Sequence, residues 1–203
     1  MKRIMTSVPH LTLVPAPAGG SLGDRADDDL MRLARSGERG AFEALVRRHQ
    51  GKVLGLALKV LGDEALARDA AQDSFVDLMR ALATYRPEGR FPQFLYRVAL
   101  NRCRMVARSL RIERRAQERA WREDCEGEAL APDDVLARER QRELSAAMQA
   151  LVPAQRELLA LRFFADLPHD EIAEVLEIPV GTVKSRLHAA VAALRATFGE
   201  ALP

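Results

Sequence analysis

The chain has 203 residues, of which 48% are hydrophobic and 30% are charged, so it can bury a core and is neither wholly disordered nor collagen-like. The formal net charge is only +2, so the total charge gives no indication of a nucleic-acid partner. Two cysteines cannot build a disulfide framework, and no run of about 18 apolar residues is present that would cross a membrane. We therefore expect a cytoplasmic protein in a reducing compartment, without direct membrane insertion.

The charge is distributed unevenly along the chain. Residues 29–120 carry 19 Lys and Arg against 11 Asp and Glu, a balance of +8. Residues 121–144 carry 4 basic and 8 acidic side chains, a balance of −4, and residues 145–203 carry 5 and 7, a balance of −2. A basic block, an acidic connector and a nearly neutral block predict two modules with different roles.

In chain order, residues 1–28 are rich in Pro, Gly, Ala and Ser without any period, which predicts a disordered leader. Apolar residues then recur with helical spacing, and a first helical module is predicted over 29–118. Within it, Gly62 should end one helix and Asp63 should cap the next. Pro and Gly predict a loop over 83–90.

An acidic linker is predicted over 119–135 because no apolar period survives there. Helical spacing returns in a second module over 136–203, whose last two helices should cover about 169–176 and 182–198. Alternating strand patterns are absent from the sequence. The predicted fold is therefore all-α, with two small helical domains joined by a flexible linker, the second domain containing a helix-turn-helix.

The helix after Asp63 carries an acidic face. Its side chains are Asp69, Gln72, Asp73 and Asp77. Stacked carboxylates at i, i+4 disfavour a helix by a few tenths of a kcal/mol per pair, roughly, which favours a protein-docking role. The alternative is a solvent-exposed face balanced by Arg68 and Arg80.

The helix that begins near Phe91 is rich in arginine, with seven Arg and one acid between residues 91 and 115. Its predicted apolar face is Phe91, Phe94, Leu95, Val98 and Met105. On another face, a stripe at i, i+4, i+7 and i+11 consists of Arg97, Asn101, Arg104 and Arg108. We call these four residues the arginine stripe. Nucleic-acid phosphate is the natural counter-charge, and an Asn can bind a base edge. The alternative is an ordinary solvated helix face.

The last two predicted helices have the length and the four-residue turn of a helix-turn-helix. Ile172, Val175 and Leu176 should face inward from the first helix, and Val183, Leu187, Ala190 and Leu194 from the second. The hydroxyl of Thr182 is expected to cap the second helix. Lys184, Ser185, Arg186 and His188 would then point outward, where they can contact phosphates or base edges. A simple helical hairpin is the alternative.

Nothing in the sequence indicates catalysis. The four His and two Cys are scattered and show no metal-ligand spacing, so no metal, cofactor or catalytic residue is expected. Arg102 and Arg104 flank Cys103, which should favour its thiolate. Two unrelated thiols are the favoured interpretation, and a redox switch with Cys125 in the linker is the alternative.

Three motifs, in this order, resemble bacterial sigma factors of the compact extracytoplasmic-function type. The first motif, which resembles region 2.2 of that family, is Asp69-Ala-Ala-Gln72-Asp73-Ser-Phe75. Regions 2.3 and 2.4 resemble Phe91-Pro-Gln-Phe94-Leu95-Tyr96-Arg97-Val98-Ala99-Leu100-Asn101. Region 4.2 resembles Ile178-Pro179-Val180-Gly181-Thr182-Val183-Lys184-Ser185-Arg186-Leu187. The resemblance covers about residues 29–198.

The resemblance implies a sigma factor, which binds core RNA polymerase, directs it to promoters and helps melt the minus-ten element. The acidic face, including Asp77, would dock on the clamp helices of the β′ subunit. The minus-ten element would be engaged by the loop 85–90 with the following helix, through Tyr85, Arg86, Arg90, Phe94 and the arginine stripe.

The resemblance also implies that the helix-turn-helix reads the minus-thirty-five element and touches the β flap. Its DNA contacts would be Thr182, Lys184, Ser185, Arg186 and His188. A cognate anti-sigma factor is expected as a further partner. Relatives often have Gly where Glu177 stands, so the turn should be strained. They often have Arg where Ala189 and Val191 stand, and the second module has a balance of −2, so the first module should supply most of the electrostatic affinity. The competing hypothesis is a helix-turn-helix regulator with a helical ligand-binding or dimerisation domain.

Overall fold

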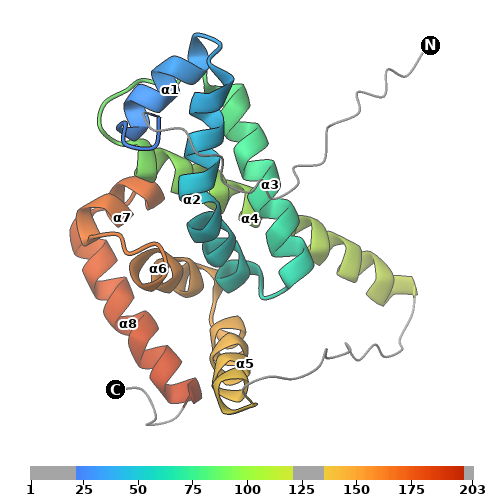
Figure 1. The fold of residues 1–203 in the computed structure, drawn as a ribbon. Helices are drawn as coiled ribbons and strands as arrows, with labels where there is room; N and C mark the ends of the chain where they lie inside the picture. Colours follow the sequence, from blue (N-terminus) through green and yellow to red (C-terminus); the bar gives the residue numbers. More distant parts are fainter. Residues whose placement is uncertain (1–21, 121–134, 199–203) are drawn as a thin grey trace.

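The computed structural model describes residues 22–120 and 135–198 (Figure 1). These two ranges contain eight helices and no strand, so the all-α prediction is confirmed. The helices are α1 (Asp27–Arg35), α2 (Arg39–Leu61), α3 (Glu64–Ala81), α4 (Phe91–Ala120), α5 (Val135–Ala150), α6 (Pro153–Phe163), α7 (His169–Leu176) and α8 (Val180–Phe198). The predicted linker, with Cys125, falls almost entirely outside the described residues.

Several helix ends lie where local chemistry predicts them. Gly62 ends α2 in the left-handed conformation, with φ of 78°, and its N–H donates to the carbonyl of Leu58. The carboxylate of Asp63 accepts the N–H of Leu66 at 2.8 Å and caps α3. Pro153 occupies the first turn of α6, where its missing N–H removes no intrahelical bond.

Two predicted boundaries were wrong. The first helix begins at Asp27, so the last residues of the predicted leader are helical, and the first 21 lie outside the described residues. Thr182 does not cap α8, because the helix already begins at Val180. The carbonyl of Pro179 accepts the N–H groups of Thr182 and Val183 at 2.9 and 3.1 Å, so the first turn closes before Thr182.

The N-terminal module consists of α1–α4, with α3 and α4 packed on α2. On α4 the buried face is formed by Phe91, Leu95, Tyr96, Ala99, Leu100 and Cys103. The prediction that Met105 belongs to this face was wrong, since its exposed fraction is 59%. Met105 lies two residues after Cys103, about 200° around the helix, and therefore points away from the core.

The C-terminal module consists of α5–α8, and its helix-turn-helix is α7 followed by α8. The inward positions predicted for α8 are all buried: Val183, Leu187, Ala190 and Leu194. On α7, Ile172 and Val175 are buried and Leu176 is partly buried. Glu177 forms the turn in the left-handed conformation, with φ of 56°, which costs a non-glycine residue roughly 1 kcal/mol.

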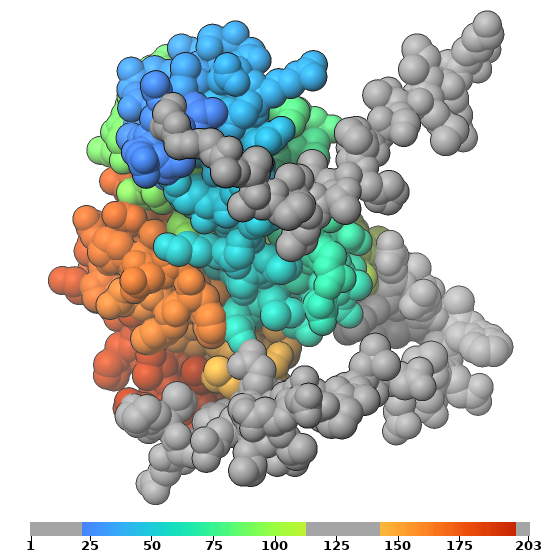
Figure 2. All heavy atoms as spheres, viewed as in Figure 1, coloured from blue at the N-terminus to red at the C-terminus, as the bar shows by residue number. Residues whose placement is uncertain are grey.

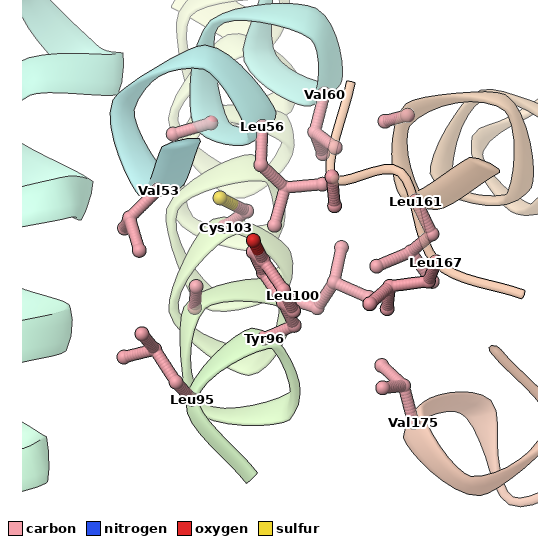
Figure 3. Packing of buried hydrophobic residues seen from close by; sticks show 14 of the residues in the cluster. Val53, Leu56, Val60, Leu95, Tyr96, Leu100, Cys103, Leu161, Leu167 and Val175 are labelled. Carbon is pink, nitrogen blue, oxygen red and sulfur yellow. The ribbon is translucent and has the colours of Figure 1, made fainter. Parts of the chain in front are cut away.

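The two modules pack directly on one another. Figure 1 shows α6 and α7 beside α2 and α4, and in Figure 2 the orange atoms of the C-terminal module lie against the cyan atoms of α2. One continuous apolar cluster joins them. In Figure 3, Tyr96 and Leu100 of α4 lie among Leu56 of α2 and Leu161 and Leu167 of the C-terminal module. The relative placement of the modules therefore decides which polar side chains meet between them.

Candidate polymerase and nucleic-acid interfaces

Two residues of the arginine stripe of α4, Arg97 and Arg104, contact the C-terminal module. Arg97 donates to the carboxylate of Glu177 at 2.9 Å, in the turn of the helix-turn-helix. Arg104 binds Glu157 of α6 with two parallel hydrogen bonds, of 2.9 and 2.6 Å. Two of the four predicted DNA-contacting residues of the stripe are thus already engaged by carboxylates of the same chain.

The Glu157 carboxylate is the most enclosed acid of this interface, since the residue is only 6% exposed. Its hydrogen bonds raise the pKa of Arg104, which stays protonated. Nearer the loop, Arg90 lies 3.4 Å from Glu174 of α7, and both side chains are largely exposed. The remaining stripe residues, Asn101 and Arg108, are exposed.

A second polar contact joins the end of α2 to the C-terminal module, and sequence reasoning missed it. Arg156 donates to the carbonyl of Val60 at 2.9 Å, and Gln149 donates to the carbonyl of Lys59 at 3.2 Å. The ammonium of Lys59 lies 4.7 Å from the ring centroid of Phe164, and burial lowers its pKa. These bonds satisfy carbonyl groups at the end of α2 that have no partner within the helix. No local pattern marks them, because the partners are about 90 residues apart.

The acidic face of α3 divides into an exposed and a paired part. Asp69, Gln72 and Asp73 are exposed. Asp77 is partly buried and accepts hydrogen bonds from both the Nε and the Nη2 atoms of Arg102 on α4.

Arg80 contacts Asp77 as well, at 3.2 Å, whereas Arg68 pairs with Glu64 instead of the acidic face. Arg102 also lies 3.6 Å from Asp73. The cost of stacking carboxylates is therefore offset mainly by a side chain of the next helix. Asp69 and Gln72 remain as the open end of the face.

The loop between α3 and α4 places Tyr85 inward rather than toward solvent. Tyr85 is 8% exposed, and its ring lies 5.0 Å from that of Phe94 and 6.1 Å from that of Phe91, centroid to centroid. Burial and the neighbouring Asp28 raise the pKa of Tyr85, so its hydroxyl is a donor at physiological pH. Arg86 and Arg90 are exposed on the same loop. Tyr85 thus lies beneath the segment that was predicted to touch DNA.

The predicted DNA-facing side chains of α8 lie on its solvent side. Lys184, Ser185, Arg186 and His188 are exposed, and Thr182 is partly buried. Among the side chains that the structure describes, none of Lys184, Arg186 and His188 is engaged in an ion pair. The Ser185 hydroxyl donates to the carbonyl of Thr182 at 3.2 Å. This end of α8 offers donors and positive charge beside a helix N-terminus, which suits a phosphate backbone.

The expectation of a reactive thiolate at Cys103 was wrong. The side chain is fully buried, and burial raises its pKa to about 12, with Glu157 adding to the effect. The flanking arginines point to other faces of the helix, Arg102 toward Asp77 and Arg104 toward Glu157. Residues adjacent in sequence point to different sides of a helix, so neither arginine lies beside the Cys103 thiol.

Within the described ranges, no three His, Cys, Asp or Glu side chains are grouped so as to hold a metal ion. Across the same residues, no helix is both long and apolar enough to span a membrane.

The described residues form an all-helical protein of two modules, with an exposed acidic helix face, an arginine-rich helix and a helix-turn-helix with a basic outer surface. Comparison with protein families narrows this class. Residues 45–113 match the family model "Sigma-70 region 2", and residues 141–194 match "Sigma-70, region 4".

Individual relatives agree with these matches. The chain is 33% identical over 174 residues to the RNA polymerase sigma-H factor of Pseudomonas aeruginosa, covering 82% of this chain and 90% of the relative. It is 32% identical over 170 residues to the RNA polymerase sigma factor CarQ of Myxococcus xanthus, covering 84% and 96%. It is 32% identical over 171 residues to the ECF (extracytoplasmic-function) RNA polymerase sigma-E factor of Salmonella typhi, covering 79% and 88%. The chain belongs to the sigma-70 family and is of the extracytoplasmic-function type.

Solved structures show the same fold. The structure of CnrH in complex with the cytosolic domain of CnrY matches with a TM-score of 0.62 and 30% identity, covering 85% of this chain and 96% of that chain. The sigma factor RpoE of Bartonella quintana, in complex with the anti-sigma factor NepR, matches with a TM-score of 0.64 at 17% identity, covering 79% and 98%.

Proposed function

We propose that this chain is a dissociable specificity subunit of RNA polymerase, without catalytic activity of its own. It binds the core enzyme, directs it to promoters and helps melt the minus-ten element. The observation that carries this proposal is the order of three surfaces in one sigma-70 chain: the open acidic face of α3, the arginine stripe of α4 and the basic end of α8.

The chemistry of each of the three surfaces suits a different partner. The exposed carboxylates of α3 suit a basic protein surface, and we assign them to the clamp helices of the β′ subunit. The arginine stripe and the exposed part of the loop 85–90 suit single-stranded DNA of the minus-ten element, where phosphates give affinity and Asn101 can read a base. Lys184, Arg186 and His188 are assigned to the minus-thirty-five element, and the C-terminal module also to the β flap.

The packing of the two modules bears on this proposal. Glu157, Glu174 and Glu177 occupy three of the arginine side chains that DNA phosphates would use. The proposed function therefore requires the modules to separate when the chain joins the polymerase and its promoter. An anti-sigma factor is proposed as a further partner, because the solved relatives CnrH and RpoE are in complexes with CnrY and NepR.

The test is reconstitution with core RNA polymerase. The chain is mixed with core enzyme, the complex is isolated by size exclusion, and transcription is measured on a promoter library randomised across both elements. A stoichiometric complex that selects promoter sequences is expected. A helix-turn-helix regulator would bind DNA alone and form no stoichiometric complex with the core, and that result would overturn the proposal.

The same library separates the two DNA surfaces. Asn101→Ala should relax base preference within the minus-ten element by about 1–3 kcal/mol, since an Asn contact to a base edge contributes about that much. Lys184→Ala should change only the engagement of the upstream element. Equal loss on every downstream sequence would show that Asn101 positions the strand rather than reads it.

A further inference from the structure

Asp28, in the first turn of α1, contacts the loop between α3 and α4 at two points. One carboxylate oxygen accepts the hydroxyl of Tyr85, and the other accepts the backbone N–H of Gly89 at 2.5 Å. These partners lie 57 and 61 residues further along the chain. A single side chain thus holds both ends of the short segment 85–89.

The two ends of this segment are immobilised in different ways. The Tyr85 ring is buried against Phe91 and Phe94, so its hydroxyl is presented at a fixed place. Gly89 has φ of 75°, a conformation that glycine adopts without strain. In this conformation the Gly89 N–H donates to the carboxylate of Asp28. Between these anchors, the side chains of Arg86, Pro87 and Glu88 are exposed.

Asp28 is itself held in place by the neighbouring residue. The carboxylate of Asp27 pairs with Arg48 and lies 3.0 Å from the ring nitrogen of His49, both on α2. Arg48 also donates to the carbonyl oxygens of Gly23 and Arg25, at 2.6 and 2.9 Å. The start of α1 is therefore fixed on α2, and a carboxylate projecting from it is a rigid support.

We propose that Asp28 is a positioning residue that sets the shape of the exposed segment 86–88 presented to promoter DNA, acting through the Tyr85 hydroxyl and the Gly89 N–H. This inference rests on the proposed function, and it assigns Tyr85 a place beneath the DNA-contacting surface rather than on it. A loop that discriminates between bases needs one conformation, and the two charge-assisted hydrogen bonds from Asp28 to Tyr85 and Gly89 hold the segment between them in one shape.

The test compares variants in holoenzyme, reconstituted on the randomised promoter library. Asp28→Ala removes both bonds, and Tyr85→Phe removes one while keeping the ring. Asp28→Asn retains an oxygen that can accept from Gly89 and an amide that can donate to the Tyr85 oxygen. The matched control is Asp29→Ala, which removes an acid from the same helical turn whose partner, Arg32, lies on α1 itself.

We expect Asp28→Ala to lower discrimination among the four bases at one or two adjacent minus-ten positions by about five- to tenfold, with core binding unchanged. Tyr85→Phe should have a smaller effect at the same positions, and the double variant should be no worse than Asp28→Ala alone. Asp28→Asn should restore most of the discrimination, and Asp29→Ala should behave as wild type.

Two results would overturn this inference while leaving the proposed function intact. The first is an unchanged base profile in Asp28→Ala holoenzyme. The second is a loss of activity that is equal on every promoter sequence and that matches the decrease in melting temperature. This result would mean that Asp28 acts on stability alone. A wild-type chain that fails to bind core polymerase would instead contradict the proposed function.

Discussion

Glu157→Gln should favour separation of the two modules. The substitution keeps the volume of the side chain, so the apolar packing around α6 is retained. It removes the negative charge and leaves one oxygen to accept from Arg104, in place of the two bonds of 2.9 and 2.6 Å. The interface between the modules then loses its most enclosed ion pair.

The size of the effect follows from burial. Hydrogen bonds to charged groups contribute about 1.5–3 kcal/mol, and the bond that remains between Arg104 and the Gln oxygen still has a charged donor. The net change is therefore the loss of one of the two bonds, and it lies below this range because the Arg104 side chain is 46% exposed and regains water when it is released. The closed arrangement should lose about 1 kcal/mol, which is a factor of about five in the ratio of open to closed molecules.

A partner that binds only the open arrangement reports this ratio directly, because its apparent affinity scales with the open fraction. Titration of the labelled chain with core polymerase should show about fivefold tighter binding for Glu157→Gln. Dyes on Lys52→Cys and Ala192→Cys, two exposed positions on α2 and α8, should report a longer distance between the modules. A Cys125→Ser background keeps the labelling specific.

The control is Asp166→Asn, which removes one charge from the same module at a side chain that is 90% exposed and pairs with Arg162 of α6. Added salt should reproduce part of the effect in the wild type, since the pairs of Arg90 and Arg97 are exposed to screening. Equal affinity and equal dye distance for Glu157→Gln and Asp166→Asn would refute this account of the interface.

Three further predictions concern single side chains. Asp69→Arg should weaken core binding by tenfold or more without lowering the melting temperature, since this exposed carboxylate is on the open end of the acidic face; an unchanged affinity at moderate salt would contradict the docking assignment. Arg102→Ala should destabilise the fold by about 1–2 kcal/mol in urea unfolding, because Asp77 is left partly buried, whereas Arg68→Ala should stay within about 0.5 kcal/mol. Cys103 should resist alkylation at pH 8 in the folded chain, its pKa being raised to about 12. In the unfolded chain this thiol ionises near its ordinary pKa of 9, whereas in the folded chain it stays protonated, so the free energy of unfolding should fall as the pH rises above 9. Rapid alkylation of the folded protein at pH 8 would contradict the burial of Cys103.

The amino-acid sequence alone predicts the helical class, several helix ends and the inward face of the helix-turn-helix. Gly62 and Asp63 end and begin helices through bonds to residues three or four positions away. Val183 and Leu187 lie on one face because they are four residues apart on a helix. The family motifs are also local runs of residues, so the order of the amino acids is enough to reveal the resemblance.

Which partner each charged side chain takes depends on how the helices of the two modules pack. Arg104 meets Glu157 across 53 residues, and Arg97 meets Glu177 across 80, once the modules have docked. Spacing along α4 shows that these arginines share a face, but it does not show what lies opposite. The same reason explains the inward Tyr85 and the inert Cys103, because burial is set by the packing of distant helices, whereas periodicity acts within a few turns of one helix.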